Sequence, residues 1–177
     1  IYENIYVYGV TEREYPISST IYNNQKSAQF IHKLNSNLTS TIFSSTFGSG
    51  SLENVLSPTA FLVDECNRIY VSGWGGSSSF GSVSNVIFGF PVTSNAFRQN
   101  TDGLDFYLAV FNEDMKSLEY ATYFGGDMSA EHVDGGTSRF SPEGIVYQSV
   151  CASCGGNNDF PTTAGVVSNV NGTIASG

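Results

Sequence analysis

Helix-forming runs are the most conspicuous shortage in this sequence. No stretch is dominated by Ala, Leu, Glu and Lys, the residues that favour helices. Aromatic residues instead make up 14% of the 177 residues, and Gly, Ser, Asn and Thr are abundant. Aromatic and β-branched side chains suit a pleated, half-buried surface, and small polar residues suit turns. The composition therefore predicts an all-β fold built from many short strands.

Positive charge is also scarce. Lys and Arg total 7 against 16 Asp and Glu, which gives a formal net charge of −9. Nucleic acids and anionic lipids both attract basic surfaces, so we expect neither as a partner. The acidic surface favours solubility. No apolar run approaches the roughly 20 residues of a spanning helix, so we expect no membrane span.

Cysteine and histidine are too few for a zinc site. The chain has three cysteines, Cys66, Cys151 and Cys154, and two scattered histidines, with no second ligand pair at zinc-finger spacing. The CxxC at 151–154 is compatible with a redox pair, but the sequence lacks the strand–helix–strand setting of such sites. We favour a structural disulfide in a secreted protein, either Cys151–Cys154 or a bridge to a cysteine outside this chain, with Cys66 as the third candidate.

An internal repeat organises the chain. Residues 107–149 repeat residues 30–72 without a gap at a constant offset of 77 positions, with six identities and matched apolar positions between them. The identical pairs are Asn35/Asn112, Ser40/Ser117, Phe47/Phe124, Gly48/Gly125, Tyr70/Tyr147 and Ser72/Ser149. Leu34, Phe43 and Phe47 fall on Phe111, Tyr120 and Phe124, so we expect these six side chains to pack between sheets.

Alternating apolar residues predict about four strands in each repeat. The expected strands cover residues 4–10, 28–34, 41–47, 59–64, 68–74, 105–112, 117–124, a short stretch near 138 and 145–150. Three aromatic–proline elements, at 15–16, 90–91 and 160–161, belong in loops or at strand edges because proline lacks an N–H donor. The repeats divide as 1–67 (degenerate), 68–144 and a partial third at 145–177, with a loop insert at 75–100 expected on the surface.

Four antiparallel strands per repeat are typical of a β-propeller blade, so the chain would hold about two blades and part of a third. A β-sandwich or an open β-solenoid is the alternative, although a sandwich does not require one four-strand unit to recur in register. Because the chain opens at Ile1 within a strand-like run and stops at Gly177 inside the third repeat, we expect a mature or internal piece of a longer protein.

Several segments resemble the SBBP family of β-propeller repeats: IYVSGW, FPVTSNAF, DFYLAVFN and LEYATYFGGD. SPTAFLVDECNRIYVSGWGG and EHVDGGTSRFSPEGIVYQSVCASCGGNNDFPTT are similar to large Bacteroidota surface proteins with a gliding-motility-associated C-terminal domain and type IX secretion. The resemblance spans nearly the whole chain, although the first repeat is degenerate and the 75–100 insert exceeds a minimal blade. It implies an extracellular structural or adhesive module and transfers no catalytic residue.

Two stretches are candidate binding sites. Asn100, Asp102 and Asp105 place oxygen side chains at near-alternating positions, as a calcium loop does, but the Asp–Gly at 102–103 is equally typical of a tight turn. Trp74, the single tryptophan, is suited to stacking on a sugar or to packing. For catalysis there is no GxSxG elbow, and nothing places Asp64, Glu65 and Asp127 across a cleft.

The sequence therefore predicts a non-catalytic structural or adhesive β-propeller module of a very large secreted cell-surface protein, located outside the cell and suited to a surface appendage or filament. Its expected partners are further repeats of the same chain, with a homo-oligomer and glycans as further options. A carbohydrate-binding propeller is the alternative function, and a propeller glycosidase or lyase is a third. No cofactor other than calcium is expected.

Overall fold

The computed structural model describes residues 4–75, 86–133, 138–152 and 157–172, and it is almost entirely β. Its elements are β1 (Ile5–Val10), β2 (Gln29–Leu34), β3 (Thr41–Phe47), β4 (Ser57–Val63), β5 (Ile69–Trp74), β6 (Phe106–Phe111), the 3-10 turn η1 (Glu113–Met115), β7 (Leu118–Phe124), β8 (Glu131–His132), β9 (Ser138–Phe140), β10 (Val146–Gln148) and β11 (Cys151–Ala152). The all-β prediction is confirmed. Within the described segments, no helix has the length and apolar character to cross a membrane.

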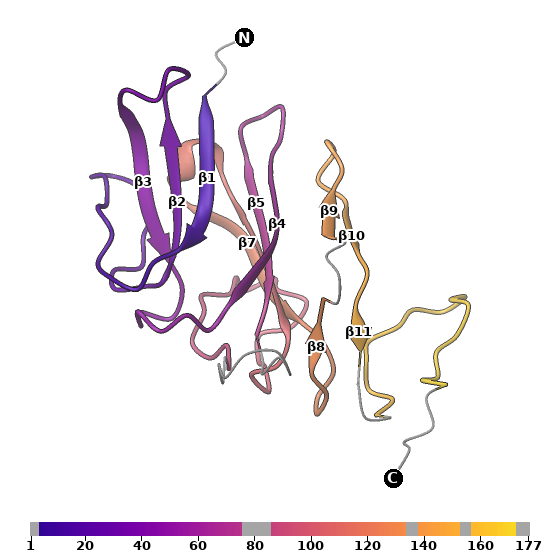
Figure 1. Ribbon diagram of the computed structural model, residues 1–177. Helices are drawn as coiled ribbons and strands as arrows, with labels where there is room; N and C mark the ends of the chain where they lie inside the picture. The colour runs from indigo at the N-terminus through magenta and orange to yellow at the C-terminus, as the bar shows by residue number, and fades with distance from the viewer. Residues whose placement is uncertain (1–3, 76–85, 134–137, 153–156, 173–177) are drawn as a thin grey trace.

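The strands form antiparallel sheets that follow one another in chain order. The first is a three-stranded sheet, β1-β2-β3, and the second is a four-stranded sheet, β4-β5-β6-β7. Two short pairs, β9 with β10 and β8 with β11, follow. Figure 1 shows the three-stranded sheet at the left, the four-stranded sheet in the middle and the short pairs at the right.

The internal repeat is a repeat of strand pairing. β6 begins and ends 77 residues after β2, and β7 begins and ends 77 residues after β3. Val63 pairs with Ile69 between β4 and β5, and Phe140 pairs with Val146 between β9 and β10, which is the same pairing 77 residues later. Matched apolar positions in the sequence therefore correspond to matched positions in the hydrogen-bonded ladders.

The sheet boundaries differ from the repeat boundaries expected at 67/68 and 144/145. β4 lies before residue 67 but pairs with β5, and β8 and β9 lie before residue 144 but pair with β11 and β10. The turn after β4 explains the first case: the Asp64 N–H donates to the Arg68 carbonyl at 3.0 Å and folds β4 back onto β5. Each of the later sheets thus takes its opening strand from the end of the preceding sequence repeat.

The main core lies between the three-stranded and four-stranded sheets. The rings of Phe47 and Phe111, one from each sheet, have centroids 5.2 Å apart, and both side chains are fully buried. Phe43 is buried in the same cluster. The core further contains Ile31, Leu56, Ile69, Val71, Ile87, Phe90, Tyr107, Ala109, Met115, Ala121 and Tyr123. Packing between sheets is therefore confirmed for three of the six expected side chains.

The other three side chains, Leu34, Tyr120 and Phe124, are only partly buried. The Tyr120 hydroxyl accepts a hydrogen bond from the Phe97 N–H at 3.1 Å, so its polar end faces a loop. Phe124 lies at the end of β7 and contacts the rings of Phe97 and Phe160 at 5.7 and 5.4 Å. Tyr120 and Phe124 contact loops at the edge of the sheet, so packing between sheets is not shown for these three side chains.

The insert expected on the surface contributes to the core in its described part, residues 86–100. Ile87 and Phe90 are buried, and the Phe90 N–H donates to the Tyr123 hydroxyl at 3.0 Å. The Tyr107 hydroxyl donates to the Pro91 carbonyl at 2.7 Å. The aromatic–proline element is therefore an anchor that holds this loop against the four-stranded sheet.

Two loops cover the outer edges of β3 and β7: residues 11–28 lie along β3, and residues 86–100 lie along β7. Along β7, the Thr93 N–H donates to the Ala121 carbonyl at 3.1 Å. Along β3, the Ser18 N–H donates to the Ser44 carbonyl at 2.9 Å. An unpaired strand edge is a template for association with another chain, so these loops protect both sheets on that side.

Candidate functional site

Two fully buried carboxylates, Asp105 and Glu131, lie side by side where the four-stranded sheet meets the third repeat. Asp105 directly precedes β6, and Glu131 begins β8, whose backbone N–H donates to the Leu104 carbonyl at 3.0 Å. A Cβ built on Gly125 would overlap both Asp105 Oδ1 and Glu131 Oε2. The two carboxylate oxygens therefore converge on one point, and only glycine leaves room for them at position 125.

Most of the oxygens in this carboxylate pair lack a hydrogen-bond donor. Among the described residues, Asp105 Oδ1, Asp105 Oδ2 and Glu131 Oε2 have no hydrogen-bond partner, whereas Glu131 Oε1 accepts from the Gly126 N–H at 3.2 Å and from Ser129 Oγ at 2.9 Å. Arg98 is the cationic side chain that lies beside the pair among the described residues, and its Nη1 is 3.7 Å from Asp105 Oδ1. Burying a charged group without a partner is costly, so the pair requires a compensating proton or cation.

The protonation equilibria of both groups reflect this environment. The pKa of Glu131 is raised to about 7, chiefly by burial. The charges of Asp105 and Asp102 also raise it, and the hydrogen bonds from Ser129 and Gly126 oppose the rise. Burial likewise raises the pKa of Asp105 above its usual range, against the opposing effects of Thr101, of Arg98 and of the Asp102 backbone, whereas the Asp102 charge adds to the rise. Carboxyl groups with strongly shifted pKa values occur both at functional sites and in structural networks. The surrounding groups show which of the two applies.

A third carboxylate, Asp159, joins the pair to the loop of the third aromatic–proline element. Asp159 Oδ2 accepts from the N–H groups of Asp127 and Met128, both at 2.7 Å. The Ser129 hydroxyl lies between Glu131 Oε1 and Asp159 Oδ1, within hydrogen-bond distance of each. The pKa of Asp159 is lowered, chiefly because Ser129 stabilises its charged form. The network thus connects the four-stranded sheet to residues of the third repeat.

The structure divides the three residues of the expected calcium loop. Asp105 is buried, whereas Asn100 is exposed and lines a cavity of about 310 Å³ together with Arg98, Asp102 and Asp127. Asp102 Oδ1 accepts from the Leu104 N–H at 2.8 Å, as expected for the alternative interpretation, a turn. Within the described segments, no group of three or more His, Cys, Asp or Glu is arranged to hold a metal ion. Sequence reasoning missed Glu131, because only the fold brings it to Asp105: the Glu131 N–H donates to the carbonyl of Leu104, the residue before Asp105.

Trp74, the candidate sugar-stacking residue, is the last residue of β5 and is partly buried. Its ring lies 5.8 Å from that of His132, with the planes tilted by 51°. This contact joins the four-stranded sheet to β8, which is the packing role considered for Trp74. A partly exposed indole still leaves stacking on a sugar as a prediction.

The candidate disulfide residues have different environments. Cys66 is a free, exposed cysteine in the turn between β4 and β5, so no bridge to it forms within this chain. Cys151, the first residue of β11, is disulfide-bonded. Cys154 lies outside the described residues.

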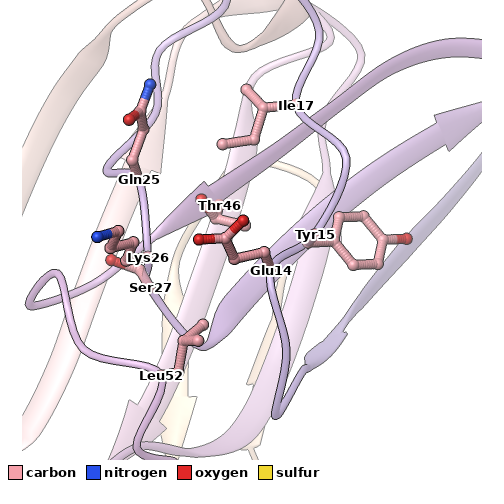
Figure 2. A pocket seen from close by; sticks show the side chains of 8 residues that line it. All are labelled: Glu14, Tyr15, Ile17, Gln25, Lys26, Ser27, Thr46 and Leu52. Carbon is pink, nitrogen blue, oxygen red and sulfur yellow. The ribbon is translucent and has the colours of Figure 1, made fainter.

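A separate small cavity lies beside the three-stranded sheet. Figure 2 shows Gln25 and Lys26 on one side of it and Glu14 and Ile17 on the other, with the Tyr15 ring directed away. Its volume is about 120 Å³, whereas pockets for small molecules are typically about 300–1,000 Å³. This cavity is too small to enclose a sugar ring with its contacts.

The chain was compared with family models, curated proteins and solved structures. Neither a family model, a curated protein nor a solved structure matches the chain.

Proposed function

We propose that the chain is a structural or adhesive β-propeller module of a large secreted cell-surface protein, built from SBBP-type repeats and without catalytic activity. The observation that carries this proposal is the repetition of strand pairing at an offset of 77 residues, from β4–β5 to β9–β10. Repeated sheets that pack on their neighbours are the building plan of propellers and other repeat proteins.

The connections between successive sheets support a load-bearing role. The first two sheets share one aromatic core, in which Phe47 meets Phe111. Farther along, Tyr70 of β5 contacts Phe140 of β9 at 5.8 Å, and Phe124 contacts Phe160 at 5.4 Å. Each repeat is therefore joined to the next by aromatic packing, which suits a module that transmits or resists force along a surface protein.

The buried position of the carboxylate pair argues against the glycosidase or lyase alternative at this site. Glycoside hydrolysis uses two carboxyl groups that flank a bond of a bound substrate. Asp105 and Glu131 are both fully buried, so a polysaccharide has no access to them in this conformation. Their chemistry favours a role inside the junction.

Surface location is the first experimental test. Antibodies raised against the chain should label intact cells of the source organism, and mild protease treatment of those cells should remove the label. Labelling only after permeabilisation would contradict an extracellular module. A strain lacking the segment that corresponds to β4–β7 should attach to surfaces less well than its parent if the module is adhesive.

A glycan array distinguishes this function from carbohydrate binding. Reproducible binding that is lost in Trp74→Ala and retained in Phe97→Ala would favour the alternative, because Phe97 is exposed but lies in another loop. Binding that neither substitution changes would remove Trp74 as the sugar contact.

A further inference from the structure

We propose that Asp105 and Glu131 form the buried core of a calcium-binding site that joins the four-stranded sheet to the third repeat. The site differs from the calcium loop expected from sequence, since Asn100 lies on the surface and Glu131 takes its place beside Asp105. The inference does not depend on the proposed function.

The orphaned oxygens are the observation that points to a ligand. Asp105 and Glu131 have no exposed surface, yet three of their four carboxylate oxygens have no hydrogen-bond partner in the part of the chain that the structure describes. Asp105 Oδ1 and Glu131 Oε2 converge over Gly125, where a side chain on residue 125 would collide with both. An acidic cluster alone would not indicate a site, but unpartnered oxygens aimed at one point inside a folded chain do.

A divalent cation satisfies these atoms better than a shared proton. One proton can bridge one oxygen of Asp105 and one of Glu131, which leaves the second Asp105 oxygen without a donor. Arg98 does not fill that gap, since its Nη1 is 3.7 Å from Asp105 Oδ1 and its guanidinium donates to the carbonyls of Gly125 and Gly126. A doubly charged ion can be coordinated by Asp105 Oδ1 and Glu131 Oε2 together, which converge over Gly125, and a bidentate Asp105 carboxylate would add its second oxygen.

The ligand chemistry favours calcium among divalent ions. The converging atoms are carboxylate oxygens, with no thiolate or imidazole among them, and hard oxygen ligands suit calcium and magnesium. Calcium accepts irregular sets of 6–8 oxygens, including waters, whereas magnesium demands near-octahedral geometry. Asp102, whose charge raises the pKa of both Asp105 and Glu131, adds negative charge near the pair.

The position of the pair gives the ion a structural effect. Asp105 precedes β6 of the four-stranded sheet, and Glu131 lies on β8, which pairs with β11 of the third repeat. Bound calcium would therefore fix the third repeat against its neighbour. Removal of calcium should loosen this junction before it affects the aromatic core between the first two sheets.

The test is calcium titration of the chain at mildly alkaline pH, followed by calorimetry and thermal unfolding. Wild-type protein treated with chelator and then given calcium at about 100 times its Kd should melt about 5 °C higher. Asp105→Asn and Glu131→Gln should lose calcium binding, whereas Glu113→Gln, an exposed carboxylate near β6, should retain it. Magnesium at the same concentration should have a smaller effect.

Absence of a calorimetric calcium signal from the folded wild-type protein would overturn the proposal, whatever the variants do. Calcium binding that Asp105→Asn retains at unchanged affinity would overturn it equally. If either variant fails to fold, amide hydrogen exchange of the wild-type protein provides the test. Calcium should slow exchange of the amides in β8 and β11. Equal exchange rates in these strands with and without calcium would contradict the site.

Discussion

Lys33 and Asp114 lie 81 positions apart in the chain, and their side chains form an ion pair across the junction of two sheets. Lys33 Nζ is 2.8 Å from Asp114 Oδ1, and the lysine is almost fully buried. Its ammonium also lies 5.0 Å from the ring centroid of Tyr6 and 5.7 Å from that of Phe43. Burial disfavours the charged lysine, but the hydrogen bond to Asp114 and the nearby Tyr6 hydroxyl raise its pKa overall. This arrangement holds a charge inside the first junction.

Asp114→Asn should weaken this junction. The substitution removes the negative charge while retaining a residue that tolerates the left-handed backbone at this position, where φ is 57°. We expect the free energy of unfolding to fall by about 1–2 kcal/mol, because Asp114 is partly exposed and its hydrogen bond is charge-assisted. Urea denaturation measures the change. Glu113→Gln, an exposed neighbour in η1, is the control, and equal effects of the two substitutions would show that the Lys33 pair contributes nothing specific.

Phe47→Ala should be the more damaging change in the aromatic core. Phe47 is fully buried and meets Phe111 of the next sheet, so truncation should reduce stability by about 3–5 kcal/mol. Phe124→Ala, at a partly buried position, should have a smaller effect, and Phe97→Ala, exposed by 64%, the smallest of the three. Thermal and chemical unfolding give the order. If Phe97→Ala reduced the free energy of unfolding as much as Phe47→Ala, the packing of Phe47 in the core would be contradicted.

Local patterns predicted the strands because they report on local geometry. Alternating side chains in residues 4–10 and 68–74 gave β1 and β5 to within one residue, and the repeat carried the assignment from β2 and β3 to β6 and β7. Gly and Asn marked the turns for the same reason. A sequence repeat shows where a pattern recurs and not where a sheet begins, so it did not reveal that β4 pairs with β5 across the turn at Asp64.

The candidate site depended even more on long-range structure. Asp105 was recognisable from its spacing to Asp102, but its partner Glu131 is brought beside it by the hydrogen bond from the Glu131 N–H to the Leu104 carbonyl and by the open space over Gly125. Lys33 looks like an ordinary strand lysine, and only the return of the chain at Asp114 explains its burial. Burial of a charged side chain leaves no periodic signal in a sequence.

The turn at Asp64 should make stability depend on pH in acid. Asp64 accepts hydrogen bonds from the N–H of Cys66, the backbone and side chain of Arg68 and the hydroxyl of Tyr70, at 2.8–3.1 Å. Burial alone would raise the pKa of Asp64, but these hydrogen bonds and the Arg68 charge lower it overall. A lowered folded-state pKa stabilises the protein above the unfolded-state pKa, and this stabilisation is lost as pH falls through the folded-state value.

Asp64→Asn should therefore reduce stability by about 2 kcal/mol at neutral pH, where a charged acceptor is lost. The difference between wild type and variant should shrink as pH falls below about 4, the ordinary pKa of aspartate. Denaturant unfolding at a series of pH values measures it. Glu65→Gln, the exposed neighbour, should leave the profile unchanged, and a difference that is constant with pH would refute the role of the Asp64 charge.

Thiol labelling should separate the two described cysteines. Cys66 is exposed and free, so iodoacetamide should modify it in the folded protein without reductant. Cys151 is disulfide-bonded and should react only after reduction. Peptide mapping by mass spectrometry distinguishes the two sites. Modification of Cys151 in natively isolated, unreduced protein would contradict this assignment.

The outer edge of β1, which pairs with no other strand among the described residues, should make residues 1–177 associate when isolated. Loops cover the outer edges of β3 and β7, but β1 is the terminal strand of its sheet and exposes Ile5 and Val7 by 36% and 39%. A strand edge with apolar neighbours accepts another strand, which in a propeller comes from the adjoining repeat. In residues 1–177 alone we therefore expect self-association, seen by light scattering as a mass that rises with concentration above 19.0 kDa.

Val7→Lys should shift that equilibrium toward the monomer, because a lysine on an edge strand opposes pairing with a second chain. Leu38→Lys adds the same charge at a position exposed by 60%, in the hairpin between β2 and β3, and should leave the association unchanged. Equal dissociation by both substitutions would mean that net charge controls association. A wild-type chain that stays monomeric at every concentration and melts cooperatively would show that the β1 edge needs no partner, and the requirement for an adjoining repeat would then be wrong.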